Sequence, residues 1–158
     1  TDTQFKADVN ISRGMFVTIL WRMVGEPKVT GGKNFPDVKT NDYYYYAVKW
    51  ASAKGIVNGY NSGKFAPNDN ITREQLAVIL QNYSKYMKRD VSKTTSLSKF
   101  KDGYKTTGYA QPAVKWAVAT GVISGKDKGT RLDPQGTATR AEASAMIYNY
   151  FTKIKGDR

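Results

Sequence analysis

The sequence predicts an all-α fold built from tandem helix–loop–helix repeats. Three observations lead to this prediction: the chain repeats itself, each copy contains two segments with apolar residues at helical spacing, and a glycine-bearing loop separates those segments. The 158 residues are 40% hydrophobic and 13% aromatic, which is enough for a folded core. One helix pair cannot bury its apolar face alone, so we expect the copies to pack on one another as a single module, 1–158.

The repeat is visible directly in the residues. Phe35 matches Phe100 at an offset of 65 residues, and Arg73 matches Arg140 at an offset of 67. The opening stretch FKADVNISRG lies over FAPNDNITRE of the next copy at an offset of 60. The chain therefore divides into the second half of a first copy at 1–27, full copies at 35–87 and 100–154, and linkers at 28–34 and 88–99.

The first helix of each full copy is predicted at about 43–54 and about 110–120. Asp42 is placed to cap the earlier helix at its N-terminus. Pro112 suits the first turn of the later helix, where its missing N–H is not needed. Each helix is followed by a glycine suited to a left-handed C-terminal cap, Gly55 and Gly121.

The second helix of each full copy begins at a capping box, Thr-x-x-Gln or Thr-x-x-Glu, at Thr72 and Thr139. Beyond the cap, apolar residues recur at helical spacing in all three copies. These residues are Phe16, Ile19, Leu20 and Met23, then Leu76, Ile79, Leu80 and Tyr83, then Ala143, Met146, Ile147 and Tyr150.

Charge and composition limit the function. Lys and Arg number 25 against 13 Asp and Glu, a net charge of +12 that favours an anionic partner such as nucleic acid, an acidic membrane surface or an acidic polysaccharide. The chain has no Cys or His, which excludes thiol catalysis and thiolate metal sites and removes the commonest neutral-pH base. No apolar run approaches the roughly 18 to 20 residues that span a bilayer, so we expect no membrane insertion. No signal peptide opens the sequence, so we expect an intracellular protein or a piece of a longer one.

The ordered pattern F-x-D, A-V-x-W-A, G-I/V-x-x-G, F/L-x-P and T-R-A/E resembles the S-layer homology repeat over nearly the whole chain. The resemblance implies a pseudo-threefold bundle that anchors a bacterial surface protein to the cell wall, without catalysis or a cofactor. It implies grooves that bind an anionic secondary cell wall polysaccharide, often through a ketal-pyruvylated amino sugar. The arginine of the T-R-A-E motif contacts the ligand in that family, and here it corresponds to Arg13, Arg73 and Arg140.

The arginines fit two interpretations. An Arg in the first helical turn lies beside free backbone N–H groups and the positive end of the helix dipole, and its guanidinium can donate two parallel hydrogen bonds to a carboxylate. Alternatively, each Arg pairs with a nearby acid and locks the loop. The recurrence at three equivalent places favours ligand binding.

Four further residues are candidates for ligand contact: Trp50, Trp116, Gly59 and Gly125. A Trp at helical spacing among alanines is typical of the core, here with one edge lining a groove. The two glycines either let a ligand approach the backbone or simply make turns. Asp37 and Asp102 are expected to cap local turns, and the Tyr43–Tyr46 run reads as a half-buried helix start rather than a sugar platform.

Other functions are weaker. No known nucleic-acid-binding motif accompanies the scattered basic residues, so we expect no nucleic acid. The recurring acids lie at structural positions, which disfavours a glycosidase, and the spacing of an EF-hand calcium loop is absent. The first copy lacks its Trp helix and glycine loop and reads Ser-Arg-Gly at its motif. An incomplete bundle exposes apolar surface, so a structural assembly module, self-associating or completed by another segment, is the alternative.

Overall fold

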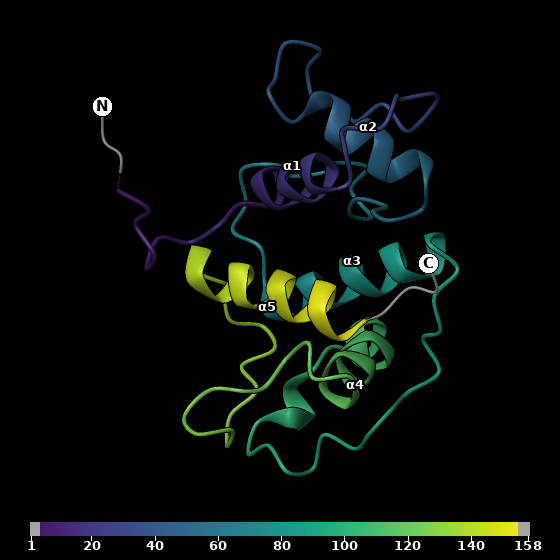
Figure 1. The fold of residues 1–158 in the computed structure, drawn as a ribbon. Helices are drawn as coiled ribbons and strands as arrows, with labels where there is room; N and C mark the ends of the chain where they lie inside the picture. Colours follow the sequence, from purple (N-terminus) through teal and green to yellow (C-terminus); the bar gives the residue numbers. More distant parts are fainter. Residues whose placement is uncertain (1–3, 155–158) are drawn as a thin grey trace. The chain divides into compact units, whose positions relative to one another are not determined.

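The computed structural model describes residues 4–154 and divides them into two compact units, Ser12–Ile71 and the remainder of the chain. The described residues contain five α-helices and four isolated β-bridges but no strand, which confirms the all-α prediction. Figure 1 shows the helices in chain order. They are α1 (Arg13–Met23), α2 (Tyr45–Ala53), α3 (Arg73–Tyr86), α4 (Gln111–Ala119) and α5 (Arg140–Lys153), with two 3₁₀ turns, Gly103–Lys105 and Gly108–Ala110, before α4.

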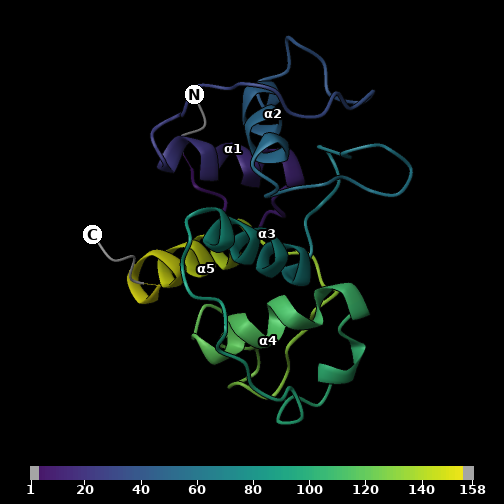
Figure 2. The ribbon, with the colours of Figure 1, turned by 90° about the vertical axis from the view of Figure 1, so that its right-hand side faces the viewer.

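The unit Ser12–Ile71 is built on the packing of α1 against α2. Here the second helix of the half copy meets the first helix of the next copy, as both views show (Figures 1 and 2). Phe16 and Leu20 of α1 and Trp50 of α2 are almost completely buried. Loop residue Phe65 is also completely buried, so the long loop of this copy belongs to the core of the unit.

The other unit repeats this packing and adds a helix. The pair of α3 and α4 again joins the second helix of one copy to the first helix of the next. The rings of Tyr83 of α3 and Tyr150 of α5 pack at a tilt of 58° with centroids 5.8 Å apart, and α5 lies beside α3 in both views (Figures 1 and 2). Ser84 and Tyr150 share a hydrogen bond of 2.9 Å between their hydroxyls.

Several local predictions are confirmed. Both capping boxes form, with Thr72 and Thr139 each accepting a backbone N–H while the side chain three residues on accepts the N–H of the cap. Pro112 lies in the first turn of α4. Gly55 and Gly121 take φ of +69° and +77°, the left-handed conformation expected after a helix.

Two predictions are wrong. Asp42 does not cap α2, which begins at Tyr45 without a side-chain cap; the Asp42 carboxylate instead accepts the N–H of Lys39 at 2.7 Å and closes a preceding turn. Ile19 and Met23 are exposed rather than buried. Within its unit α1 packs on α2, whereas α3 packs on both α4 and α5, so an additional face of α3 is covered.

Candidate functional site

The three motif arginines lie at equivalent joints between a helix start and a loop of another copy. At each joint, which we call a helix–loop joint, the first two helical N–H groups donate to carbonyls of that loop, and each joint lies within one unit. The bonds are Arg13 N to Asp69 O (2.9 Å) and Gly14 N to Pro67 O (2.8 Å); Arg73 N to Gly136 O (3.0 Å) and Glu74 N to Pro134 O (2.8 Å); and Arg140 N to Val9 O (2.8 Å) and Ala141 N to Ala7 O (3.1 Å).

These bonds correct part of the sequence-based rationale. A helix start offers free N–H groups to an anion only while nothing else accepts from them. Here loop carbonyls take the first two, and the hydroxyl of Ser12, Thr72 or Thr139 takes the third. The expectation of free backbone donors beside each arginine is therefore wrong, and an anion would have to be held by side chains.

Arg13 is anchored by the loop of the second copy. Its Nε donates to the carbonyl of Phe65 at 3.0 Å. The guanidinium carbon lies 4.5 Å from the ring centroid of Tyr60 and 4.9 Å from that of Phe65, both within cation–π range. Only 6% of the residue is exposed, so the surrounding chain fixes the orientation of the guanidinium plane.

Arg73 is anchored in the same way by the loop of the third copy. Its Nε donates to the carbonyl of Leu132 at 3.0 Å, and its Nη1 lies 3.7 Å from Oε1 of Glu142. Burial lowers the pKa of the guanidinium, against the opposing effect of Glu142, yet an arginine remains charged at neutral pH. The alternative interpretation is that each arginine pairs with a nearby acid of the protein. At Arg73 the structure contains such an acid, Glu142.

Arg140 is the least enclosed of the three. Its guanidinium carbon lies 5.3 Å from the ring centroid of Phe5, and the residue is half-buried rather than buried. Phe5 occupies the position that Phe65 and Leu132 hold in the other copies. An anion could reach Arg140 with less rearrangement than it would need at Arg13 or Arg73.

A network of charges surrounds Arg73. The Lys126 ammonium lies 2.8 Å from Asp133 and 2.9 Å from Glu142, and Nη1 of Arg131 lies 3.6 Å from Asp133. Burial by itself would raise the pKa of the Glu142 carboxyl, but the N–H of Thr139 and the Lys126 ammonium outweigh it, and the pKa is lowered. Burial likewise opposes the charge on Lys126, but its two carboxylate partners prevail and raise its pKa. Three cations, Arg73 included, and two acids thus stabilise one another at this joint.

The two tryptophans lie in the core. Trp50 and Trp116 are each 1% exposed, so a sugar would reach them only after a rearrangement of the helices around them. Their equivalent burial in two copies agrees with the interpretation that a Trp among alanines is a packing residue.

The two candidate glycines face the protein's own side chains. Gly59 and Gly125 have φ of +76° and +82°, a region that L residues with a Cβ rarely adopt. A Cβ added at Gly59 would come within 2.6 Å of the Phe35 ring, and one at Gly125 within 2.8 Å of the Phe100 ring. In the structure, the absence of a Cβ at these glycines lets a phenylalanine ring of the same copy pack against the backbone.

Asp37 and Asp102 have a role that the sequence analysis missed. Asp37 accepts the N–H groups of Phe65 and Ala66 at 3.0 and 2.7 Å, and Asp102 accepts those of Leu132 and Asp133 at 2.7 and 2.8 Å. These are clamps across 28 to 31 residues rather than caps of local turns. Burial opposes the charge on Asp102, but the two N–H bonds outweigh it and lower its pKa. The recurrence of F-x-D at the start of each copy was the available signal.

The backbone at the clamped loops repeats as well. Ala66 and Asp133 have φ of +55° and +52°, and Lys6, at the same position of the half copy, has +45°. Lys, Ala and Asp share no side-chain chemistry, so residue type could not have predicted this left-handed position. It turns the chain so that the carbonyls that follow meet the helix start.

The tyrosine run and the acidic residues add no ligand or metal site within residues 4–154. Tyr44 is buried while Tyr43 and Tyr46 are exposed, which agrees with a half-buried helix start. Within residues 4–154, no three acidic side chains gather closely enough to hold a metal ion. No helix in that part of the chain has the length and apolar character needed to cross a membrane.

Comparison with known proteins identifies the family to which these repeats belong. The S-layer homology domain profile matches residues 34–77 and 99–144. The chain is 34% identical over 158 residues to an amylopullulanase of Thermoanaerobacterium thermosulfurigenes, covering 97% of this chain and 8% of that protein. It is 33% identical to the surface-layer 125 kDa protein of Lysinibacillus sphaericus, over 87% of this chain and 11% of the relative.

A third relative is the cellulosome-anchoring protein of Acetivibrio thermocellus, 29% identical over 90% of this chain and 32% of its own length. The chain thus spans between 8% and 32% of the length of these three proteins, and their activities as whole proteins do not describe it. The two profile matches and the repeated joints of helix and loop show that this chain belongs to the S-layer homology domain family.

Proposed function

We propose that this chain is a non-catalytic module that anchors a longer protein to a bacterial cell wall by binding an anionic secondary cell wall polysaccharide. The observation that carries the proposal is the recurrence of a guanidinium at the same helix–loop joint three times, in a chain with a net charge of +12. Such a charge speeds the capture of a polyanion. Relatives named for cellulosome anchoring and for the surface layer support a location at the cell surface.

The ligand group we propose is a carboxylate, such as that of a ketal-pyruvylated amino sugar. A planar guanidinium can donate two parallel hydrogen bonds to a carboxylate, which an ammonium cannot do with the same geometry. Arg140 is the first candidate because it is the least enclosed, and Arg13 follows. Arg73 takes part less directly, because Glu142 already faces it. Trp50, Trp116, Gly59 and Gly125 serve this function by supporting the joints.

The copies, in this proposal, form the pseudo-threefold bundle that the resemblance implies. Its support is that the same pair of backbone bonds occurs at three helix starts, with loops that share a left-handed residue at one position. A bundle of this kind presents equivalent surfaces to successive units of a repeating polymer, which raises the effective affinity of weak individual contacts.

The test is a binding assay with cell walls of Lysinibacillus sphaericus, either intact or stripped of polysaccharide by hydrofluoric acid. Intact walls should retain the chain and stripped walls should not. Arg140→Gln should weaken binding by about fivefold to tenfold, which corresponds to about 1 to 1.4 kcal/mol for one hydrogen-bonded contact at a half-buried position. Arg22→Gln is the matched control, because it removes the same charge from an exposed surface pair with Glu26.

The double variant Arg73→Gln and Arg140→Gln, checked for retained helicity, extends the test. Undiminished binding by the double variant would contradict the arginine assignment. Equal retention on stripped walls would contradict the polysaccharide itself. Competition by DNA as effective as competition by the purified glycan would favour nucleic-acid binding instead.

A second candidate function, an assembly module, is favoured by the outer face of α5. In α1 and α3 the corresponding face is covered by α2 and α4. Val17 and Ala77 are completely buried there, and Gln81 is 7% exposed. Their counterparts on α5, Ser144 and Tyr148, are exposed, Tyr148 to 70%. Within the described residues, α5 has no helix of this type on that face.

We propose that a helix of the A-V-x-W-A type, supplied by another segment or another copy of the chain, covers this face of α5. The isolated chain should then self-associate, and Ala145→Arg, on the exposed face, should prevent association without lowering stability. Sedimentation velocity measures the association of the wild type and of the variant, and thermal unfolding compares their stability. A monodisperse monomer at all accessible concentrations would contradict self-association.

A further inference from the structure

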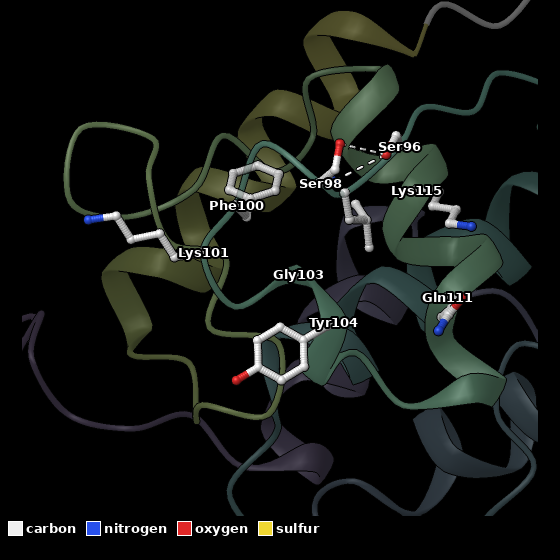
Figure 3. Close-up of a pocket in the computed structure, with 9 residues that line it drawn as sticks. Ser96, Ser98, Phe100, Lys101, Gly103, Tyr104, Gln111 and Lys115 are labelled. Carbon is white, nitrogen blue, oxygen red and sulfur yellow. Dashed lines mark hydrogen bonds between the residues drawn. The ribbon is translucent and has the colours of Figure 1, made fainter.

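A hollow of about 490 Å³ lies in the third copy between the linker that precedes it and the start of α4. The linker residues Ser96 to Ser98 form one side, Gln111 and Lys115 of α4 another, and Tyr104 a third (Figure 3). The volume falls within the range of sites for small ligands. None of the motif arginines lines this hollow, so it is distinct from the helix–loop joints.

The second copy fills the equivalent place with its own linker. There Lys49, the counterpart of Lys115, donates to the carbonyl of Gly32 at 3.0 Å and to Oδ1 of Asn34 at 2.8 Å. The N–H of Lys33 donates to the hydroxyl of Ser52 at 2.9 Å, which ties the linker to α2 a second time. The lysine of this copy is therefore used to hold the protein together.

Three residue changes prevent the linker of the third copy from taking that path. Gly32 lies so close to the carbonyl of Lys49 that any Cβ would collide with it, and the third copy has Leu97 at this position. Lys99 replaces Asn34 and removes the acceptor. Val118 replaces Ser52 and cannot accept the linker N–H.

The linker of the third copy instead packs against the 3₁₀ turn before α4. Leu97 is buried, and its carbonyl lies where a Cβ of Gly103 would be. Lys115 is left half-buried at the hollow, and no acid or carbonyl within the described residues accepts from its ammonium. A cation without a protein acceptor at the wall of a hollow is available to an anion.

We propose that this hollow is an additional subsite for one acidic sugar unit, in which Lys115 pairs with a carboxylate. The inference rests on the proposed binding of an anionic wall polysaccharide. Tyr104, 80% exposed, offers a ring face to the sugar, and Gln111 offers an amide to its hydroxyls. Lys101 extends outward at the rim, where it adds positive charge rather than a direct contact (Figure 3).

The experiment measures the affinity of the whole chain for polysaccharide purified from Lysinibacillus sphaericus walls, by isothermal titration calorimetry. Lys115→Met should weaken binding about fivefold, the effect of one solvent-accessible ion pair, and leave the melting temperature unchanged. Lys49→Met is the matched control: it removes the same charge from the same helix position, but should leave affinity within twofold of the wild type. Tyr104→Ala, at an exposed position, should weaken binding about threefold or more through lost stacking.

A second arm uses the same polysaccharide after chemical reduction of its carboxyl groups to alcohols. The difference between wild type and Lys115→Met should disappear with this polymer. Equal affinities of Lys115→Met and Lys49→Met for the untreated polymer would overturn the proposal, and so would a difference that persists after reduction. Failure of the wild-type chain to bind at all would contradict the proposed function, which is a separate result from either of these.

Discussion

The joints at Arg13 and Arg73 share a backbone design but differ in their side chains. In both, Nε of the arginine donates at 3.0 Å to a loop carbonyl of the following copy. Around Arg13 the loop supplies the rings of Tyr60 and Phe65. At the position of Tyr60 the third copy has Lys126, a second cation beside Arg73, and at that of Ala66 it has Asp133.

The difference shows which part of the joint is structural. A lysine beside an arginine is unfavourable unless acids offset both charges, and Asp133 and Glu142 do so in the third copy. An aromatic ring needs no such compensation. The backbone bonds, the aspartate clamp and the left-handed residue are constant, whereas the side chains around the guanidinium vary. If the joints bind an anionic polymer as proposed, a difference in ligand selectivity between them would arise from positions 60 and 126, since the arginines are the same.

The aspartate clamps should give the largest effect, because they are common to both joints. Asp102→Ala leaves two loop N–H groups of Leu132 and Asp133 without their acceptor. We expect a loss of about 3 kcal/mol, since each unpaired N–H costs about 1 to 3 kcal/mol when buried. For a chain of this length that corresponds to a fall in melting temperature of roughly 6 to 12 °C.

Asp37→Ala in the second copy is the matched comparison, and its effect should be of the same size. Asp90→Ala is the control, because this exposed acid only caps a short turn at Ser92. Thermal unfolding followed by circular dichroism measures all three. A clamp whose loss shifts the melting temperature no more than Asp90→Ala does would contradict the shared design.

The paired glycines should give the next largest effect. Gly59→Ala and Gly125→Ala each force a Cβ into a left-handed residue and against a phenylalanine ring. We expect about 2 kcal/mol of destabilisation for each, from backbone strain together with overpacking. Gly63→Ala is a useful control, since its φ of +78° brings the same strain but its Cβ would meet nothing within 4 Å. Denaturant unfolding should therefore rank Gly63→Ala as milder than the other two.

Much of the fold could be predicted from the sequence, because it depends on local rules. Capping boxes, a proline in a first turn and glycines after helices are signals carried by one to four neighbouring residues, and the capping boxes and the glycines also recur between copies. Asp42 shows the limit: its side chain can cap a helix or close the turn before it, and the neighbouring residues decide. The clamps of Asp37 and Asp102 depend on a loop about 30 residues away, which local rules do not describe.

The candidate site was less predictable than the fold. The arginine positions follow from the repeat, but whether the N–H groups at a helix start are free or hydrogen-bonded depends on carbonyls of a different copy. The hollow at Lys115 depends on the absence of a contact that Gly32 makes in the other copy. The hydrogen bonding of the helix starts and the hollow at Lys115 cannot be deduced from the sequence of one copy, because both depend on where a segment outside the helix packs.

The substitution with the smallest expected effect, Glu142→Gln, tests the contribution of the charges at the Arg73 joint alone. Glu142→Gln preserves the capping box, as Gln75 does in the second copy, but removes the partner of Lys126 and Arg73. Because the folded-state pKa of Glu142 is lowered, its carboxylate contributes stability above its unfolded pKa of about 4.3, and this contribution is lost as the pH falls through the folded value. We therefore expect the variant to be about 1 kcal/mol less stable at pH 7, with the difference shrinking below about pH 4.

Glu26→Gln is the control, because it removes an acid from an exposed pair and should change stability by no more than a few tenths of a kcal/mol at any pH. Urea unfolding between pH 3 and 7 measures both, and a pH-independent difference for Glu142→Gln would show that the charges on Glu142, Lys126 and Arg73 do not stabilise the joint at Arg73.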